Sequence, residues 1–424
     1  MSEIVKSTTA VLLMVCFYIF LFIERPWESI RHLQNVPIER VYAIAMIVMA
    51  IMHGRFKVIY SPVNKWVYGL LAMHFVLAPF AFTPSNAVDQ GIEYAKVVIL
   101  YLLMLSVVDD EETLKILIKA FIFSMIFYCL HSLWEYNNGR YVHRMGISRM
   151  VGVDSTFSDP NAFGASVVLS LPFVYALLRE EASRWLRKIY YGYYAIAVNC
   201  IVLTGSRSAF VGLMVLVVLW VLSQKGIRKL KILAAVLPIV FLVWTYMPLE
   251  KQNRIRTLWD PESGPANAQE SAEGRLEGFK VSWKMFKQVP FTGVGAGGKN
   301  FIGYRMAHNI DEEGHEMPLQ AHNLYGEVLA EFGVLGACLL SGLVFSIFRC
   351  CFVVRRELGE LGMVDAFSYN LANAIVAALI LLLFLGLGGH NFYRPMWLWL
   401  AAWTGALFNI VNARGFMGAS KKWS

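Results

Sequence analysis

A histidine and two arginines, each at the predicted start of a helix, have side chains that could transfer a group from a pyrophosphate-activated donor. His322 lies in AHNLYGEVLAEFGVLG, Arg207 in LTGSRSAFVGL and Arg275 in GRLEGFKVSW. A histidine can take a proton near neutral pH, and the planar donor fork of a guanidinium suits a pyrophosphate. The predicted chemistry is transfer to a hydroxyl, with His322 as the base. Arg207 and Arg275 would neutralise charge that grows on the leaving group.

Each of these residues also has a structural interpretation. A histidine before a helix is commonly a cap or a packed residue, and an arginine at the end of a span can extend its charge to the membrane surface. Asn323 and Asn161 are predicted to bind the substrate together with the arginines. However, Asp159 to Asn161 is also typical of a turn that caps a helix. Asp154 and Asp159 are the alternative carboxylates for a base.

The dipeptide His-Asn occurs three times, at 308–309, 322–323 and 390–391. We favour the second pair because Glu331, Phe332 and Gly333 follow it on the same helix, whereas 308–309 falls in a polar loop. Glu327 or Glu331 could hold the imidazole, although helical spacing makes Asn323 and Glu327 the closer pair.

Two other stretches suggest a cofactor, and we predict none for either. GVGAGGKN (293–300) approaches the phosphate-loop pattern GxxxxGK[ST], but Asn300 stands where Ser or Thr would bind magnesium, and no buried strand precedes it. We interpret it as a flexible turn. The stretch DEEGHE (311–316) offers groups that a metal could use, but it is more typical of a solvated loop.

The composition indicates a chain embedded in lipid. Of its 424 residues, 57% are hydrophobic and 16% are charged, against about 25% charged in soluble domains. A membrane helix needs about 20 mostly apolar residues. About 12 such runs occur, near 8–23, 38–53, 64–83, 92–108, 114–134, 161–178, 187–204, 207–223, 230–247, 322–348, 367–387 and 391–412. The expected fold is an all-α polytopic membrane protein, with one membrane domain over 1–424 and a first run that is retained rather than cleaved.

The orientation follows from alternate short loops, in which Lys and Arg concentrate. The positive-inside rule places these loops and both termini in the cytoplasm. The formal charge of +8 is therefore mainly a topology signal, and we predict no nucleic-acid partner. The outer side carries two long segments, 135–160 and 248–320. The second lies between the ninth and tenth runs, and a loop that long is usually functional.

One part of the longer outer segment is predicted to be an amphipathic helix. In 274–289, Leu276, Phe279, Trp283 and Phe286 recur at helical spacing. This stripe is typical of a helix that lies in the lipid headgroup layer, and equally of one that packs on neighbouring spans.

Five stretches, in this order, resemble the bacterial O-antigen ligase and O-antigen polymerase superfamily, which includes protein O-oligosaccharyltransferases. They are STFSDPNAFGASVVLSLP, LTGSRSAFVGL, GRLEGFKVSW, FTGVGAGGKNF and AHNLYGEVLAEFGVLG. The resemblance covers most of the chain from about residue 150 onward. It implies an inverting membrane glycosyltransferase that takes a glycan from undecaprenyl pyrophosphate, without nucleotide sugar or a required metal. It also implies an active site on the periplasmic side of the bacterial inner membrane. The essential residues of the family fall on Arg207, Arg275 and His322.

The acceptor stays open within this resemblance. A ligase attaches finished polymer to lipid A-core, a polymerase extends a growing polysaccharide, and a protein-glycosylating member commonly has a larger C-terminal periplasmic part. We favour ligation because a single, much longer outer segment, 248–320, comes late in the chain. The alternative of another class is a secondary transporter, but such proteins commonly show two similar halves, and no half-repeat is evident. Residues 1–110 predict only spans and orientation.

Overall fold

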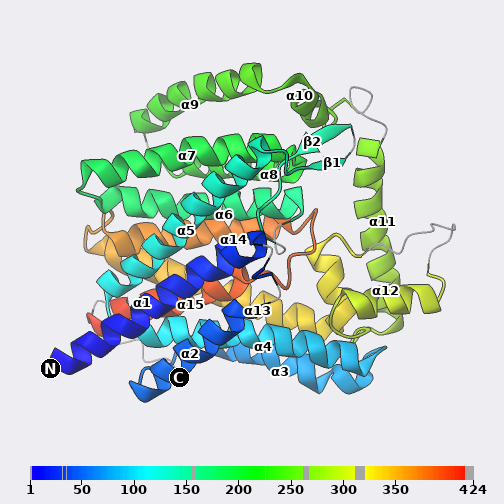
Figure 1. Ribbon diagram of the computed structural model, residues 1–424, viewed down its shortest axis with the longest axis horizontal. Coiled ribbons are helices and arrows are strands. Elements are labelled where there is room, and N and C mark those ends of the chain that lie inside the picture. The colour runs from blue at the N-terminus through cyan, green and yellow to red at the C-terminus, as the bar shows by residue number, and fades with distance from the viewer. Residues whose placement is uncertain are drawn as a thin grey trace. The chain divides into compact units, whose positions relative to one another are not determined.

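The computed structural model describes residues 2–415 except 31, 35, 145, 155–157, 225, 261–266 and 311–319, and this part is mostly helical (Figure 1). Its α-helices are α1 (Ser2–Glu24), α2 (Ile38–Met52), α3 (Asn64–Val76), α4 (Pro84–Val107), α5 (Glu111–Asn137), α6 (Pro160–Glu180), α7 (Arg184–Thr204), α8 (Arg207–Leu222), α9 (Gly226–Tyr246), α10 (Leu249–Arg256), α11 (Asn267–Gln288), α12 (Gly298–Ala307), α13 (Leu324–Glu360), α14 (Phe367–Leu385) and α15 (Met396–Ala413). Two 3₁₀ helices, η1 (Pro26–Ser29) and η2 (Ala78–Phe80), and two strands, β1 (Val142–Arg144) and β2 (Ile147–Arg149), are the other regular elements in the described ranges.

The structure confirms a helical protein with several membrane-capable helices. Among the described residues, six segments are long and apolar enough to cross a membrane: Thr9–Ser29, α4, α5, α6, α13 and α14. The pair α9 and α10, bent by 114°, would make a seventh if it counts as one span. Helices also cover part of every other predicted run, but the larger number of about 12 spans stays a prediction.

The chain forms two compact units. Unit 1 comprises Met1–Cys16, Tyr42–Ile118 and Glu273–Ser424, and unit 2 comprises Phe17–Val41 and Lys119–Ala272. In unit 1, α13 packs against α3, α14 and α15, and α4 packs against α3 and α15. Glycines allow the closest approach of α3 and α13, because a Cβ at Gly342 would overlap the ring of Trp66.

Helix α13 is broken at Gly333, and the loop 290–297 docks at the break. Gly333 has φ +62° and ψ −153°, a conformation that glycine adopts without the Cβ penalty. The backbone N–H of Val334 donates to Pro290 O over 2.8 Å, and that of Val294 donates to Ala330 O over 2.8 Å. The prediction of a flexible turn at 293–300 is therefore wrong, because the loop is held by the backbone groups that the break leaves free.

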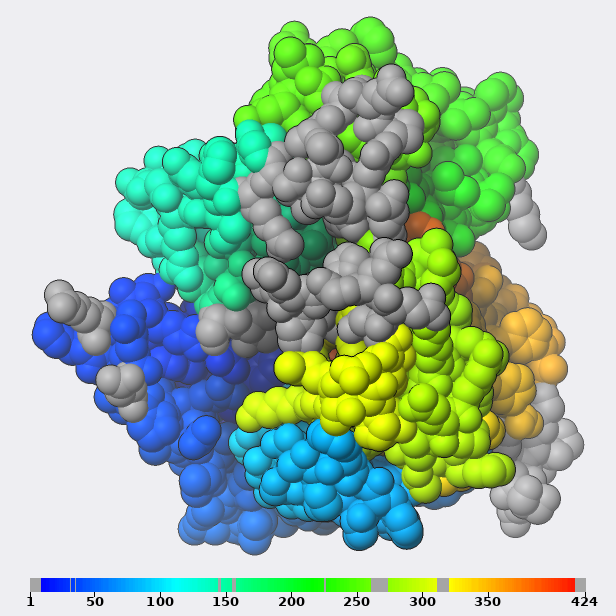
Figure 2. All heavy atoms as spheres, turned by 90° about the vertical axis from the view of Figure 1, so that its right-hand side faces the viewer, coloured from blue at the N-terminus to red at the C-terminus, as the bar shows by residue number. Residues whose placement is uncertain are grey.

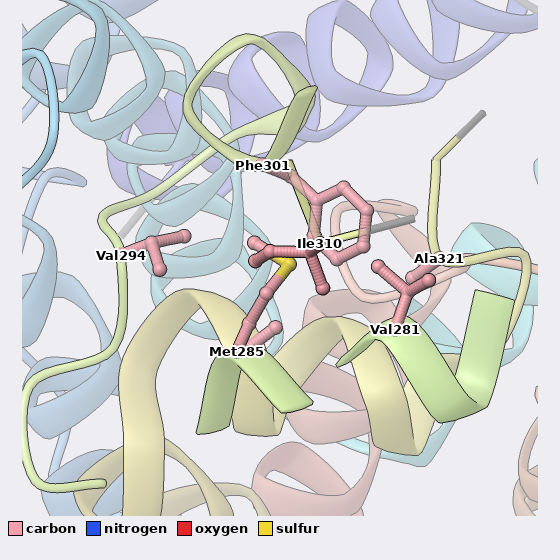
Figure 3. Close-up of a cluster of buried hydrophobic side chains, with 7 residues drawn as sticks. Val281, Met285, Val294, Phe301, Ile310 and Ala321 are labelled. Atoms are coloured by element: carbon pink, nitrogen blue, oxygen red, sulfur yellow. The ribbon is translucent and has the colours of Figure 1, made fainter. Parts of the chain in front are cut away.

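A buried apolar cluster packs α11, this loop and α12 on the start of α13 (Figure 3). The cluster consists of Val281, Met285, Val294, Phe301, Ile310, Ala321 and Ala330. Figure 3 shows Val281 and Met285 of α11 close to Phe301 of α12. In Figure 2, α11 and α12 (yellow-green to yellow) lie beside the light-blue segment that joins α3 and α4, where Asn300 accepts a hydrogen bond from the Thr83 N–H over 2.9 Å.

In unit 2, α6 packs against α7 and α8, and the strands β1 and β2 form a hairpin that the sequence did not predict. The strands are antiparallel, with Val142 opposite Arg149, and Gly146 in the connection has φ +73°. Each strand has three residues, too few for the alternating pattern that identifies a strand in a sequence.

Candidate functional site

His322 immediately precedes the cap of α13, as predicted. The Asn323 side-chain oxygen accepts from the N–H groups of Tyr325 (2.9 Å) and Gly326 (3.0 Å), which are the usual hydrogen bonds of an asparagine N-cap. His322 itself has φ +47° and is one of three described non-glycine residues with positive φ. Such a backbone is held only where the surroundings enforce it, and it is concentrated at functional sites. His322 is half-buried.

The turn between α14 and α15 brings Arg275 and His322 to the same place in unit 1. The Asn323 side-chain amide donates to Leu387 O over 2.9 Å. One residue later, a Cβ added at Gly388 would lie 3.1 Å from the Arg275 guanidinium. The imidazole rings of His322 and His390 have their centroids 5.2 Å apart. The structure therefore joins two of the three predicted catalytic residues around the turn 386–391.

Arg275 does not lie in the first turn of its helix, contrary to the prediction. Helix α11 begins at Asn267, about two turns earlier at 3.6 residues per turn. The preceding residues, AQESAE (268–273), are mostly good helix formers, which explains the extension. The free N–H groups at the start of α11 are thus remote from Arg275. An anion beside Arg275 would be bound by the guanidinium and not by the helix start.

The two acids of α13 hold the backbone around the site. Glu327 accepts from the N–H of Phe392 over 3.1 Å. Glu331 accepts from the N–H of Gly297 over 2.7 Å and from the Tyr393 hydroxyl. Both carboxylates are at most 4% exposed. These hydrogen bonds fix the loop 290–297 and the residues after His390, and a contact of either acid with the His322 imidazole stays a prediction.

Arg207 is the first residue of α8, as predicted, and it lies in unit 2. Ser206 caps the helix by accepting from the N–H of Ala209 over 3.3 Å. The Arg207 guanidinium donates to the Thr257 hydroxyl over 3.1 Å, and the residue is 8% exposed. His322 and Arg275, by contrast, belong to unit 1.

Three buried basic residues surround the turn before Arg207, and the sequence did not single them out. They are Arg149, Lys251 and Arg254, at most 4% exposed. Arg149 donates to Thr204 O over 2.9 Å, and Arg254 donates to Gly205 O over 2.6 Å. Burial lowers the pKa of Lys251. No local sequence pattern identifies these residues, because the turn that they surround is distant in the sequence. Arg149 contacts Thr204, and Arg254 contacts Gly205, in each case about 50 residues away along the chain.

Asn161 also contributes to this turn. Its side-chain oxygen accepts from Arg149 over 3.0 Å and from the Ser206 hydroxyl over 2.8 Å. Asn161 thereby links the start of α6 to the turn that precedes Arg207. The contacts describe a positioning residue, like those of Asn323 at α13.

The two carboxylates considered as alternative bases have structural roles. Asp159 caps α6 by accepting from the N–H groups of Asn161 (2.8 Å) and Ala162 (3.0 Å), which confirms the capping interpretation. Asp154 is 0% exposed and accepts from the Tyr128 hydroxyl over 2.5 Å. An acceptor hydroxyl cannot reach Asp154 in this conformation.

The loop that suggested a nucleotide does not fit one. The loop 293–297 directs the N–H groups of Val294, Gly295 and Gly297 to α13, so they cannot cradle a phosphate. Within the described ranges, no three His, Cys, Asp or Glu side chains lie close enough to hold a metal ion. The stretch 311–316 falls outside the described residues. The ring of His308, directly after α12, stacks on Tyr304 at a centroid distance of 3.9 Å.

One segment of the chain is similar to a known protein family. No curated protein matches the chain. The family model for O-antigen ligase matches residues 192–341. This range contains Arg207, Arg275 and His322 together with the docked loop and the break in α13. This segment is similar to O-antigen ligase, and the similarity supports the O-antigen ligase and polymerase superfamily for residues 192–341.

Proposed function

We propose that this protein transfers a glycan from undecaprenyl pyrophosphate to a hydroxyl acceptor, and that the reaction is ligation of O-antigen to lipid A-core. The observation that carries the proposal is the convergence of His322 and Arg275 on the turn 386–391. A base and an anion ligand are the two groups that this transfer requires. The match to O-antigen ligase over 192–341 supports a glycosyltransferase of the ligase and polymerase type.

In the proposed reaction, His322 takes the proton of the acceptor hydroxyl while the acceptor oxygen bonds to the anomeric carbon. The bond between that carbon and the pyrophosphate oxygen breaks, and undecaprenyl pyrophosphate leaves with the electron pair. Arg275 and Arg207 are proposed to bind the pyrophosphate and to stabilise its growing charge. Neither a metal nor another cofactor takes part in this scheme.

Asn323 and Asn161 were predicted to bind the substrate directly. Their side chains are engaged in hydrogen bonds with the protein, which support an indirect role. We propose that Asn323 positions His322 through the α13 cap. Asn161 correspondingly positions Arg207 through Ser206.

The site is proposed to face the periplasm at the surface of the inner membrane, with both termini in the cytoplasm. Three of the four residues of the predicted stripe on α11 are exposed, with Leu276 at 58%, Phe279 at 36% and Trp283 at 43%. The fourth, Phe286, is half-buried, so packing on neighbouring spans stays an alternative prediction. An exposed apolar stripe supports a helix in the headgroup layer, the depth at which a lipid-linked pyrophosphate lies.

Deletion of the gene distinguishes the proposed ligase from its alternatives when surface and lipid-linked glycans are resolved by size on a gel. Ligation predicts long polymer stranded on undecaprenyl pyrophosphate and bare lipid A-core outside. A polymerase would instead be identified by either of two results. Lipid A-core would carry a single repeat unit, or free polysaccharide would be absent while single repeat units accumulate on the carrier lipid. Unchanged glycans with loss of a gradient-driven uptake would identify a transporter and contradict the proposal.

A further inference from the structure

Another His-Asn pair, His390-Asn391, lies on the turn that Asn323 contacts. The Asn391 side-chain amide donates to Leu382 O over 2.8 Å. Asn323 donates to Leu387 O on the same turn over 2.9 Å. In each pair the asparagine that follows the histidine binds backbone near the turn 386–391. Asn323 binds the turn itself, and Asn391 binds the last part of α14.

The two histidine rings face one another. Their centroids are 5.2 Å apart and their planes are tilted by 55°. Both residues are partly exposed. At this centroid distance the two tilted rings are in contact, so an anionic group that binds one imidazole at its edge lies beside the other.

The turn is held firmly enough to fix the place of His390. Leu324 donates its N–H to Gly386 O over 2.7 Å, and Phe392 donates its N–H to Glu327 over 3.1 Å. Both partners belong to α13, so the turn is fixed to this helix on either side of His390. Arg275 lies against Gly388 between these two points.

We propose that His390 is a further donor-binding residue, whose imidazole binds the pyrophosphate beside Arg275. This inference rests on the proposed function and divides the two histidines by role. His322 carries the positive φ at the helix cap and is the base. His390 extends the anion site that Arg275 begins, so its loss affects donor binding and leaves the chemical step largely intact.

The test measures donor KM and kcat for His390→Ala, His390→Gln and His390→Arg in the full-length protein, with undecaprenyl-pyrophosphate-linked glycan as donor. Loss of a charge-assisted hydrogen bond is expected to raise donor KM about 10-fold or more in the Ala and Gln variants. The expected change in kcat is less than about threefold. His390→Arg should restore much of the donor affinity because it returns a cationic donor. If His390 has only a structural role, His390→Gln should keep donor KM closer to the wild-type value than His390→Arg does. That result would overturn the proposal.

A second pair of variants tests the turn without touching a histidine. Gly388→Ala places a methyl group 3.1 Å from the Arg275 guanidinium, whereas Gly389→Ala finds its nearest atom, Leu385 O, at 3.5 Å. Neither glycine has a positive φ, so only the contact differs. Donor KM should rise in the first variant and not in the second, and equal values in both would contradict the donor site at this turn.

The outcomes separate this inference from the proposed function. If the folded wild-type protein transfers no glycan, both the proposed function and this inference are wrong. Wild-type transfer that needs His322, with unchanged donor KM in His390→Ala, would remove the role of His390 alone.

Discussion

His322→Ala is expected to lower kcat for glycan transfer by about 10²–10⁴-fold, the usual contribution of a positioned general base. Donor KM should change little, because the anion ligands remain. Alanine cannot take the acceptor proton, while the Asn323 cap that starts α13 is unaffected. The measurement is a steady-state transfer assay with purified variant, accompanied by a check of folding through thermal unfolding in detergent.

His308→Ala is the matched control for this variant. His308 is followed by an asparagine like His322, and it is exposed and stacked on Tyr304 at the end of α12. Its loss should leave kcat within about threefold of the wild-type value, as expected of a surface substitution. Near-normal product from folded His322→Ala would remove the histidine from the mechanism.

Arg275→Lys is expected to weaken donor binding by about 10- to 150-fold, which corresponds to the 1.5–3 kcal/mol of a hydrogen bond to a charged group. Lysine keeps the charge but loses the planar fork that binds two oxygens of a phosphate at once. The same change is expected for Arg207→Lys. Equilibrium binding of undecaprenyl-pyrophosphate-linked glycan measures both.

Arg356→Lys provides the control for these arginine variants. Its side chain is 42% exposed and pairs with Glu357 near the end of α13, so donor affinity should not change. Wild-type affinity in both Arg275→Lys and Arg207→Lys would contradict bidentate recognition of the pyrophosphate. Loss in only one of them would restrict that role to the residue affected.

The sequence predicted the parts of this protein that depend on local pattern. Apolar runs identified the helices, and residue type with position at a helix start identified His322 and Arg207. The capping role of Asp159 followed from its turn chemistry. These properties arise within one or two turns of chain, and the structure preserves them.

Properties that depend on distant contacts were missed. The glycine-rich loop at 293–297 looked flexible, but Glu331, 34 residues away from Gly297, holds it. Nothing beside Arg149 or Arg254 in the sequence indicated that both bind the turn before Arg207. His390 was set aside as a repeated dipeptide, and only the fold of α13, α14 and α15 shows that it faces His322.

The most direct test of the account is transfer by the purified protein in liposomes. The donor is undecaprenyl-pyrophosphate-linked glycan, the acceptor is lipid A-core, and a metal chelator is present throughout. Ligation by this protein predicts glycan on lipid A-core and one free undecaprenyl pyrophosphate for each glycan transferred. A folded protein that forms no such product, or forms it only after a divalent ion is added, would contradict the account.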